Sequence, residues 1–158
     1  MPDGDAKTRP TADARFGHGF LHDIWYFAAL GSDLKAGKLQ RYEILGEPIL
    51  LGRDRAGKVY AIKDICPHRA APLSAGKLTA EADGTPSVEC PYHGWRFRTD
   101  GACTAIPSLV EDQAMDVSRI RVRRYPAAES QGLVFVWISA DPRFDGEPDI
   151  APPTIAVT

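Results

Sequence analysis

The stretches CPHRAAPLSAG at residues 66–76 and CPYHGWRF at residues 90–97 decide how this chain is interpreted. Each stretch contains one cysteine and one histidine, in the patterns C-x-H and C-x-x-H, and a proline follows each cysteine. Segments of strand-forming composition flank both stretches, so each is expected to form a loop between strands. The sequence therefore predicts two loop tips that each offer one thiolate and one imidazole as metal ligands.

Two thiolates and two imidazoles suit two kinds of metal site. A [2Fe–2S] cluster can take thiolates on one iron and imidazoles on the other, and a structural zinc ion can take the same four groups. Zinc modules usually keep the two thiols together in sequence and the two imidazoles together, whereas each loop here mixes them. The spacing favours the cluster, with the zinc module as the alternative, and the candidate ligands are Cys66, His68, Cys90 and His93.

Both stretches resemble the Rieske domain of the ring-hydroxylating oxygenase alpha-subunit family, and the Tyr-His-Gly-Trp ending is typical of its oxygenase branch. The likeness extends from Trp25 to Ile138. It implies one [2Fe–2S] cluster per chain, with Cys66 and Cys90 on one iron. His68 and His93 would bind the other, outer iron. Around these ligands the resemblance places Arg69, Tyr92, Gly94 and Trp95.

Four departures from related proteins bear on this interpretation. The family often has glycine where this chain has Ala70, and the stretch containing residues 81–85 is longer than usual. Respiratory Rieske proteins carry two more cysteines that join the loops, where this chain has Ala71 and Tyr92. They also place a hydroxyl donor where Trp95 stands. We therefore expect a reduction potential nearer about −150 mV than +300 mV.

The segments around the two loops predict an all-β fold, and the resemblance implies the Rieske arrangement of antiparallel sheets with a small cluster-binding subdomain at one end. The only helical candidate of any length covers residues 109–115. Strands are expected at residues 24–27, 41–45, 48–53, 58–63, 87–90, 95–98, 120–123 and 133–138. The last of these is apolar throughout, which predicts a strand covered on both faces.

We divide the chain into three segments. Residues 1–22 are polar, contain several glycines and prolines, and are expected to form a loose arm. Residues 23–140 form the expected Rieske domain. Residues 141–158 contain four prolines among acidic and small residues, which predicts an extended linker or tail.

Composition limits the classes of partner. The chain has 158 residues, 44% of them hydrophobic and 25% charged, as in an ordinary globular domain. A formal net charge of −2 argues against nucleic acid or an anionic membrane as the main partner. With no apolar run of about 18 residues and no signal-like start, a cytoplasmic location is expected.

The resemblance implies that the domain accepts one electron from a reductase or ferredoxin and delivers it to a mononuclear iron site in an oxygenase domain. That iron site is expected outside this chain, because two of its four histidines are already assigned to the cluster. The other two, His18 and His22, lie on a glycine-containing arm for which no site is predicted. A free-standing Rieske ferredoxin is the alternative. The long arm and tail favour the oxygenase domain.

Two further groups of residues have plain structural interpretations. Cys103, the only other cysteine, is expected to be a small buried hydrophobic residue. A basic strand face is expected to be a solvated edge, with a docking patch as the alternative, and consists of Arg119, Arg121, Arg123 and Arg124.

Overall fold

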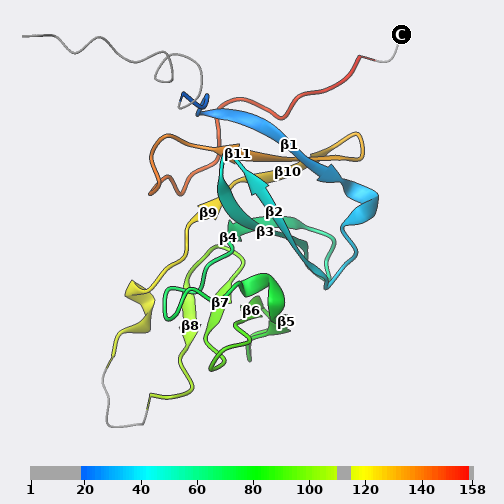
Figure 1. Cartoon of the computed structure of the whole chain (residues 1–158). Helices are drawn as coiled ribbons and strands as arrows, with labels where there is room; N and C mark the ends of the chain where they lie inside the picture. Colours follow the sequence, from blue (N-terminus) through cyan, green and yellow to red (C-terminus); the bar gives the residue numbers. More distant parts are fainter. Residues whose placement is uncertain (1–18, 110–114, 157–158) are drawn as a thin grey trace, which may run out of the picture.

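The computed structural model describes residues 19–109 and 115–156, and these contain eleven strands in three antiparallel sheets (Figure 1). The predicted all-β class is therefore confirmed. The strands are β1 (Ile24–Leu30), β2 (Leu39–Ile44), β3 (Glu47–Arg53), β4 (Val59–Lys63), β5 (Lys77–Ala80), β6 (Pro86–Glu89), β7 (Arg96–Arg98), β8 (Cys103–Ala105), β9 (Arg124–Tyr125), β10 (Ala127–Ser130) and β11 (Leu133–Ile138). Three short 3-10 helices accompany them: η1 (Gly31–Asp33), η2 (Leu73–Ala75) and η3 (Val117–Arg119).

The three sheets form two regions. The base combines the sheet β1-β11-β10 with the sheet β2-β3-β4-β9. The tip is the sheet β5-β6-β7-β8, which lies at the lower end of the molecule in Figure 1. The chain enters the tip after β4 and returns to the base at β9, so the tip is one insertion between two neighbouring base strands.

Strands β3 and β4 separate two hydrophobic cores, because their side chains alternate between the two faces. The base core contains Ala29, Leu34, Ile49, Leu51, Val59, Ala61, Tyr125, Val134, Val136 and Ile138. The tip core contains Leu50, Tyr60, Ile62, Cys66, Leu73, Val88, Cys90, Phe97, Cys103, Ile106 and Val122. Where the two strands pair, Gly52 lies opposite Tyr60, and a Cβ at Gly52 would come within 2.5 Å of the Tyr60 hydroxyl.

Most of the strand predictions are confirmed, with boundaries shifted by one to three residues. The run at residues 133–138 is β11, whose last five residues are buried, as expected for a strand covered on both faces. The prediction of a strand at residues 120–123 is wrong. These residues cross from tip to base, and their main chain bonds to both regions: Val122 N–H donates to Gly101 and the Arg123 carbonyl accepts from Lys63.

Four strands were not predicted: β5, β8, β9 and β10. Each has two to four residues and little hydrophobic alternation, and each is held by hydrogen bonds to a neighbouring strand. Residues 110–114 of the helical candidate at 109–115 lie outside the described residues, as does the expected arm up to residue 18. No helix within the described ranges has the length and hydropathy needed to cross a membrane.

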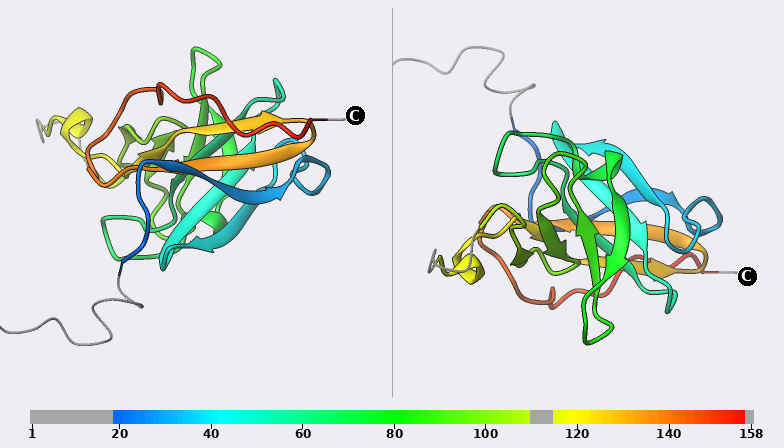
Figure 2. Two further views of the ribbon diagram at one scale, coloured as in Figure 1. Left: turned by 90° about the horizontal axis from the view of Figure 1, so that it is seen from above. Right: turned by 90° about the horizontal axis from the view of Figure 1, so that it is seen from below.

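The segment after β11 runs back along the sheet β1-β11-β10, and Figure 2 shows it in red beside these strands. The indole N–H of Trp25 donates to the Ile150 carbonyl at 2.7 Å. The Gln131 side-chain amide donates to the Ile155 carbonyl at 2.8 Å and accepts from its N–H at 2.6 Å. Hydrogen bonds at both Ile150 and Ile155 thus attach this segment to the base.

Candidate metal centre

The first loop connects β4 in the base to β5 in the tip. The Cys66 N–H donates to the Ala71 carbonyl, and the Ala70 N–H donates back to the Cys66 carbonyl, both at 2.8 Å. These bonds fold the loop so that Cys66 points inward and His68 is at its exposed end. Ala70 has a φ of 58°, in the left-handed region. This explains physically why glycine, which adopts that region without strain, suits the position.

The second loop is the turn of the hairpin β6–β7. The Cys90 N–H donates to the Trp95 carbonyl at 2.7 Å, and the Tyr92 N–H approaches the Cys90 sulfur at 3.4 Å. His93 and Gly94 both have positive φ values, of 69° and 72°. The turn therefore reverses through two left-handed residues, which places His93 on the surface and Cys90 inside.

The two loops meet with their cysteines inside and their histidines outside. Cys66 and Cys90 are 1% and 2% exposed, and both belong to the buried cluster of the tip core. The His68 and His93 rings are exposed, with their centroids 5.2 Å apart. Gly76 closes the first loop against the second, since a Cβ there would collide with the Glu89 carbonyl oxygen. The structure thus brings together all four residues that the sequence singled out.

The four residues expected around the ligands differ in their contacts. The Trp95 ring stacks on His68, with centroids 4.6 Å apart and planes 7° apart. Within the described part of the chain its buried indole N–H has no hydrogen-bond partner. Tyr92 is 56% exposed and sits edge-on to His93. Gly94 lies against the Pro107 ring, and Arg69 is an exposed residue next to His68.

Burial sets the protonation of the Cys66 thiol. It raises the pKa of the Cys66 thiol to about 11, and the neighbouring Cys90 thiol adds to this, while the His68 N–H works in the opposite direction. The thiol is therefore protonated at neutral pH, and binding of a metal by the thiolate releases that proton. Affinity for metal at Cys66 should therefore rise with pH.

The donor set fits two bridged iron ions better than one metal ion. A tetrahedral zinc site needs four donors directed at one point. In residues 19–109 and 115–156 no three His, Cys, Asp or Glu side chains converge closely enough to hold a single ion. The donors are instead separated, with thiols inside and imidazoles outside, as expected when each pair serves a different iron.

Comparison with known proteins agrees with this geometry. The family profile described as the Rieske [2Fe-2S] domain matches residues 24–126. The chain belongs to the Rieske family. Chlorophyllide a oxygenase of Chlamydomonas reinhardtii is 38% identical over 84% of this chain and 19% of its own length. The expected family is confirmed, and membership implies a [2Fe–2S] cluster.

Among solved structures, this Rieske domain is similar to parts of oxygenases. Dicamba monooxygenase without ligand has a TM-score of 0.65 and 37% identity, covering 85% of this chain and 37% of its own. The reduced complex between oxygenase and ferredoxin in carbazole 1,9a-dioxygenase has a TM-score of 0.60 and 25% identity, covering 84% and 30%. The Rieske chain thus spans about a fifth to two fifths of the length of these relatives.

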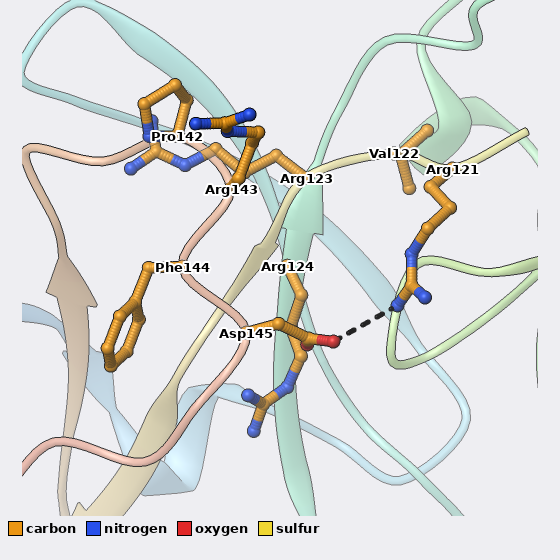
Figure 3. Close-up of a pocket in the computed structure, with 8 residues that line it drawn as sticks. All are labelled: Arg121, Val122, Arg123, Arg124, Pro142, Arg143, Phe144 and Asp145. Atoms are coloured by element: carbon orange, nitrogen blue, oxygen red, sulfur yellow. Dashed lines mark ion pairs between the residues drawn. The ribbon is translucent and has the colours of Figure 1, made fainter. Parts of the chain in front are cut away.

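The predicted basic face is a set of ion pairs. Arg121 and Asp145 form a pair at 3.5 Å at the rim of a cavity of about 380 Å³ (Figure 3). Arg123 pairs with Glu47 at 3.0 Å. The other two arginines, Arg119 and Arg124, pair with Asp116 and Glu147. Carboxylates balance all four guanidinium groups, which does not favour a docking patch. The side chains of Arg123 and Arg124 are only 14% and 22% exposed, so the four arginines do not form one solvated strand edge either.

The remaining expectations concern single residues. Cys103 is 4% exposed in the tip core, where burial raises its thiol pKa, so the buried hydrophobic role is confirmed. His22 is exposed, and His18 lies outside the described residues. Sequence reasoning missed Asp64, a buried carboxylate two residues before Cys66. No local signal marked it, because its partners Arg41 and Ser74 lie 23 and 10 residues away in the sequence.

Proposed function

We propose that Cys66 and Cys90 hold one iron, and His68 and His93 the other, of a single [2Fe–2S] cluster per chain. The observation that carries this proposal is the meeting of two mixed loops, with both thiols buried in one cluster and the centroids of the exposed imidazole rings 5.2 Å apart. When bound, such a cluster supplies one-electron transfer. The domain would then pass single electrons as part of a Rieske oxygenase for aromatic hydroxylation or O-demethylation.

The protein residues would control access to the cluster. Buried Cys66 and Cys90 would keep water away from the inner iron, while the exposed edges of His68 and His93 would form the contact for electron exchange. Trp95, stacked on His68, would fix the plane of that imidazole. With an indole in this position and no hydroxyl donor, the potential should lie near the low end of the Rieske range, and a midpoint above about +100 mV would contradict this.

The partners follow from the same proposal. A reductase or ferredoxin would donate the electron, and a mononuclear-iron oxygenase domain would accept it. The structural relative solved as a complex between oxygenase and ferredoxin supports a ferredoxin donor. The relatives named above are oxygenases longer than this chain, which favours an oxygenase domain over a free-standing carrier. The cytoplasmic location stays a prediction, as do the boundaries 1–22, 23–140 and 141–158.

Metal analysis tests the proposal directly. The purified chain should contain two iron and two acid-labile sulfide per polypeptide and give a paramagnetic signal when reduced. Replacing Cys90 by serine should abolish the signal. Cys103→Ser is the matched control, because Cys103 is equally buried in the same core but faces the Ala105 carbonyl, and it should keep the cluster. Colourless protein with one zinc ion, or full loading of Cys90→Ser, would contradict the assignment.

A further inference from the structure

Asp64 is a fully buried carboxylate, with 0% of its surface exposed. It lies directly after β4 and two residues before Cys66, at the entrance to the first loop. A buried carboxylate is strongly unfavourable unless hydrogen bonds and a positive charge compensate it. The groups that hydrogen-bond to the Asp64 carboxylate therefore indicate its role.

Three donors from two other segments meet the Asp64 carboxylate. Its Oδ1 accepts the Ser74 N–H at 2.6 Å, and its Oδ2 accepts the Ser74 hydroxyl at 2.6 Å. Oδ2 also accepts Nη1 of Arg41, which is on β2 in the base, at 3.0 Å. The main-chain N–H of Asp64 donates to Pro48 on β3. We call the contacts of Asp64 with Ser74 and Arg41 the Asp64 bridge.

The bridge joins the two ends of the first loop. Asp64 precedes Cys66 and His68, and Ser74 follows them in η2. The second loop needs no such link, because the ladder of the hairpin β6–β7 pairs its two ends, Glu89 with Arg96. The first loop leaves the base sheet and enters the tip sheet, so no strand pairing connects its two ends.

We propose that Asp64 is a positioning residue, which fixes Cys66 and His68 in register with the second loop by holding Ser74 and Arg41. This inference rests on the proposed cluster site, but the bridge itself does not contain a ligand. Loss of one hydrogen bond to a buried charged group should increase the population of the opened loop about tenfold. Loss of the Ser74 hydroxyl should not affect β11 in the base, because Ser74 lies in the loop and Asp64 keeps its contact with Arg41 on β2.

The test uses the full chain and the pair Ser74→Ala and Ser74→Thr. Alanine removes the hydroxyl donor, whereas threonine keeps it. Glu129→Gln is the matched control, because Glu129 also accepts from an arginine, Arg53 at 2.7 Å, but belongs to the base. Asp64→Asn removes the charge while keeping the size, and if it does not fold, the Ser74 pair decides.

Two measurements separate positioning from general stability. In the iron-free chain, amide hydrogen exchange at residues 66–73 should be about tenfold faster in Ser74→Ala, with β11 unchanged. In the chain loaded with iron, Ser74→Ala should lose iron to a chelator about tenfold faster than the unaltered chain. Ser74→Thr should restore both rates, and Glu129→Gln should leave both unchanged.

If Ser74→Ala showed the same exchange and iron-loss rates as the unaltered chain, the proposed role of Asp64 would be refuted. The same would follow if exchange in β11 accelerated as much as exchange at residues 66–73. If the unaltered chain bound no iron, the proposed function would fail. The exchange measurement on the iron-free chain would still decide the bridge, so the two failures are distinguishable.

Discussion

The base core and the tip core share β3 and β4, yet they are closed in different ways. Strands cover the base core, and its buried members are apolar side chains together with Tyr125. The tip core ends at two loops, where Cys66 and Cys90 are packed among hydrophobic residues and expose their histidine neighbours. Packing alone completes the base, whereas the proposed cluster would complete the tip. The following changes should separate the two regions.

Removing iron should have the largest effect, and only on the tip. If the cluster joins the two loops, chelation should accelerate amide exchange at residues 66–73 and 90–95 by about 100-fold or more. Exchange in β1 and β11 should stay the same. Hydrogen exchange followed by mass spectrometry checks this, and a uniform acceleration across the chain would show that the two cores do not differ.

Phe97→Ala should reduce the stability of the tip core by about 3–5 kcal/mol, because the ring is fully buried and its loss leaves a cavity. Phe27→Ala is the matched control on β1, where the ring is 56% exposed. Its effect should stay at about 1 kcal/mol, because the exposed ring loses only its edge-on contact with Phe135. Denaturant titration measures both. Equal losses for the two variants would mean that burial in the tip core does not govern stability.

Tyr125→Phe should destabilise the base by about 1.5 kcal/mol, because the Tyr125 hydroxyl donates to the Glu47 carboxylate. Burial and Glu47 together raise the pKa of this phenol, so the donor stays protonated across the accessible pH range. Tyr42→Phe removes a hydroxyl that bonds only a neutral amide, on Gln40, and should cost less. A larger loss in Tyr42→Phe by thermal denaturation would contradict the ranking.

The smallest expected effect is a pH dependence in the base. A hydrogen bond from Arg53 lowers the pKa of Glu129 below its ordinary value of 4.5. A lowered pKa in the folded state means that the pair stabilises the protein above pH 4.5 and loses this contribution as pH falls through the folded pKa. The contribution should be below about 1 kcal/mol. Glu129→Gln should flatten the acid side of the stability curve, and an unchanged curve would contradict the assignment.

The sequence predicted those parts of the molecule that local composition determines. Apolar and β-branched runs located β1, β3, β4 and β11, and the Cys-Pro pairs located both loops. The sequence wrongly predicted a strand at residues 120–123, because apolar and charged residues alternate there. The backbone of these residues instead crosses from the tip to the base. The short strands β5, β8, β9 and β10 also lacked a local signal, since pairing with neighbours stabilises them.

The role of Asp64 was hidden for a different reason. Nothing in the residues next to it distinguishes a buried carboxylate from a solvated one. Its burial depends on Arg41, 23 residues earlier, and Ser74, ten residues later, and only folding brings these donors together. Ligand residues could be recognised from spacing, but the residues that hold the ligand loop required the tertiary structure.

The contact of Gly52 with Tyr60 has a consequence for how the chain selects one sheet alignment. Residues 49–52 of β3 are buried on both faces, so a shift by one residue would still place apolar groups in both cores. Such a shift would bring the side chain of Leu51 or Arg53 onto the Tyr60 ring, where only a glycine fits. A residue without a side chain therefore excludes the alternative alignment that hydrophobicity would tolerate.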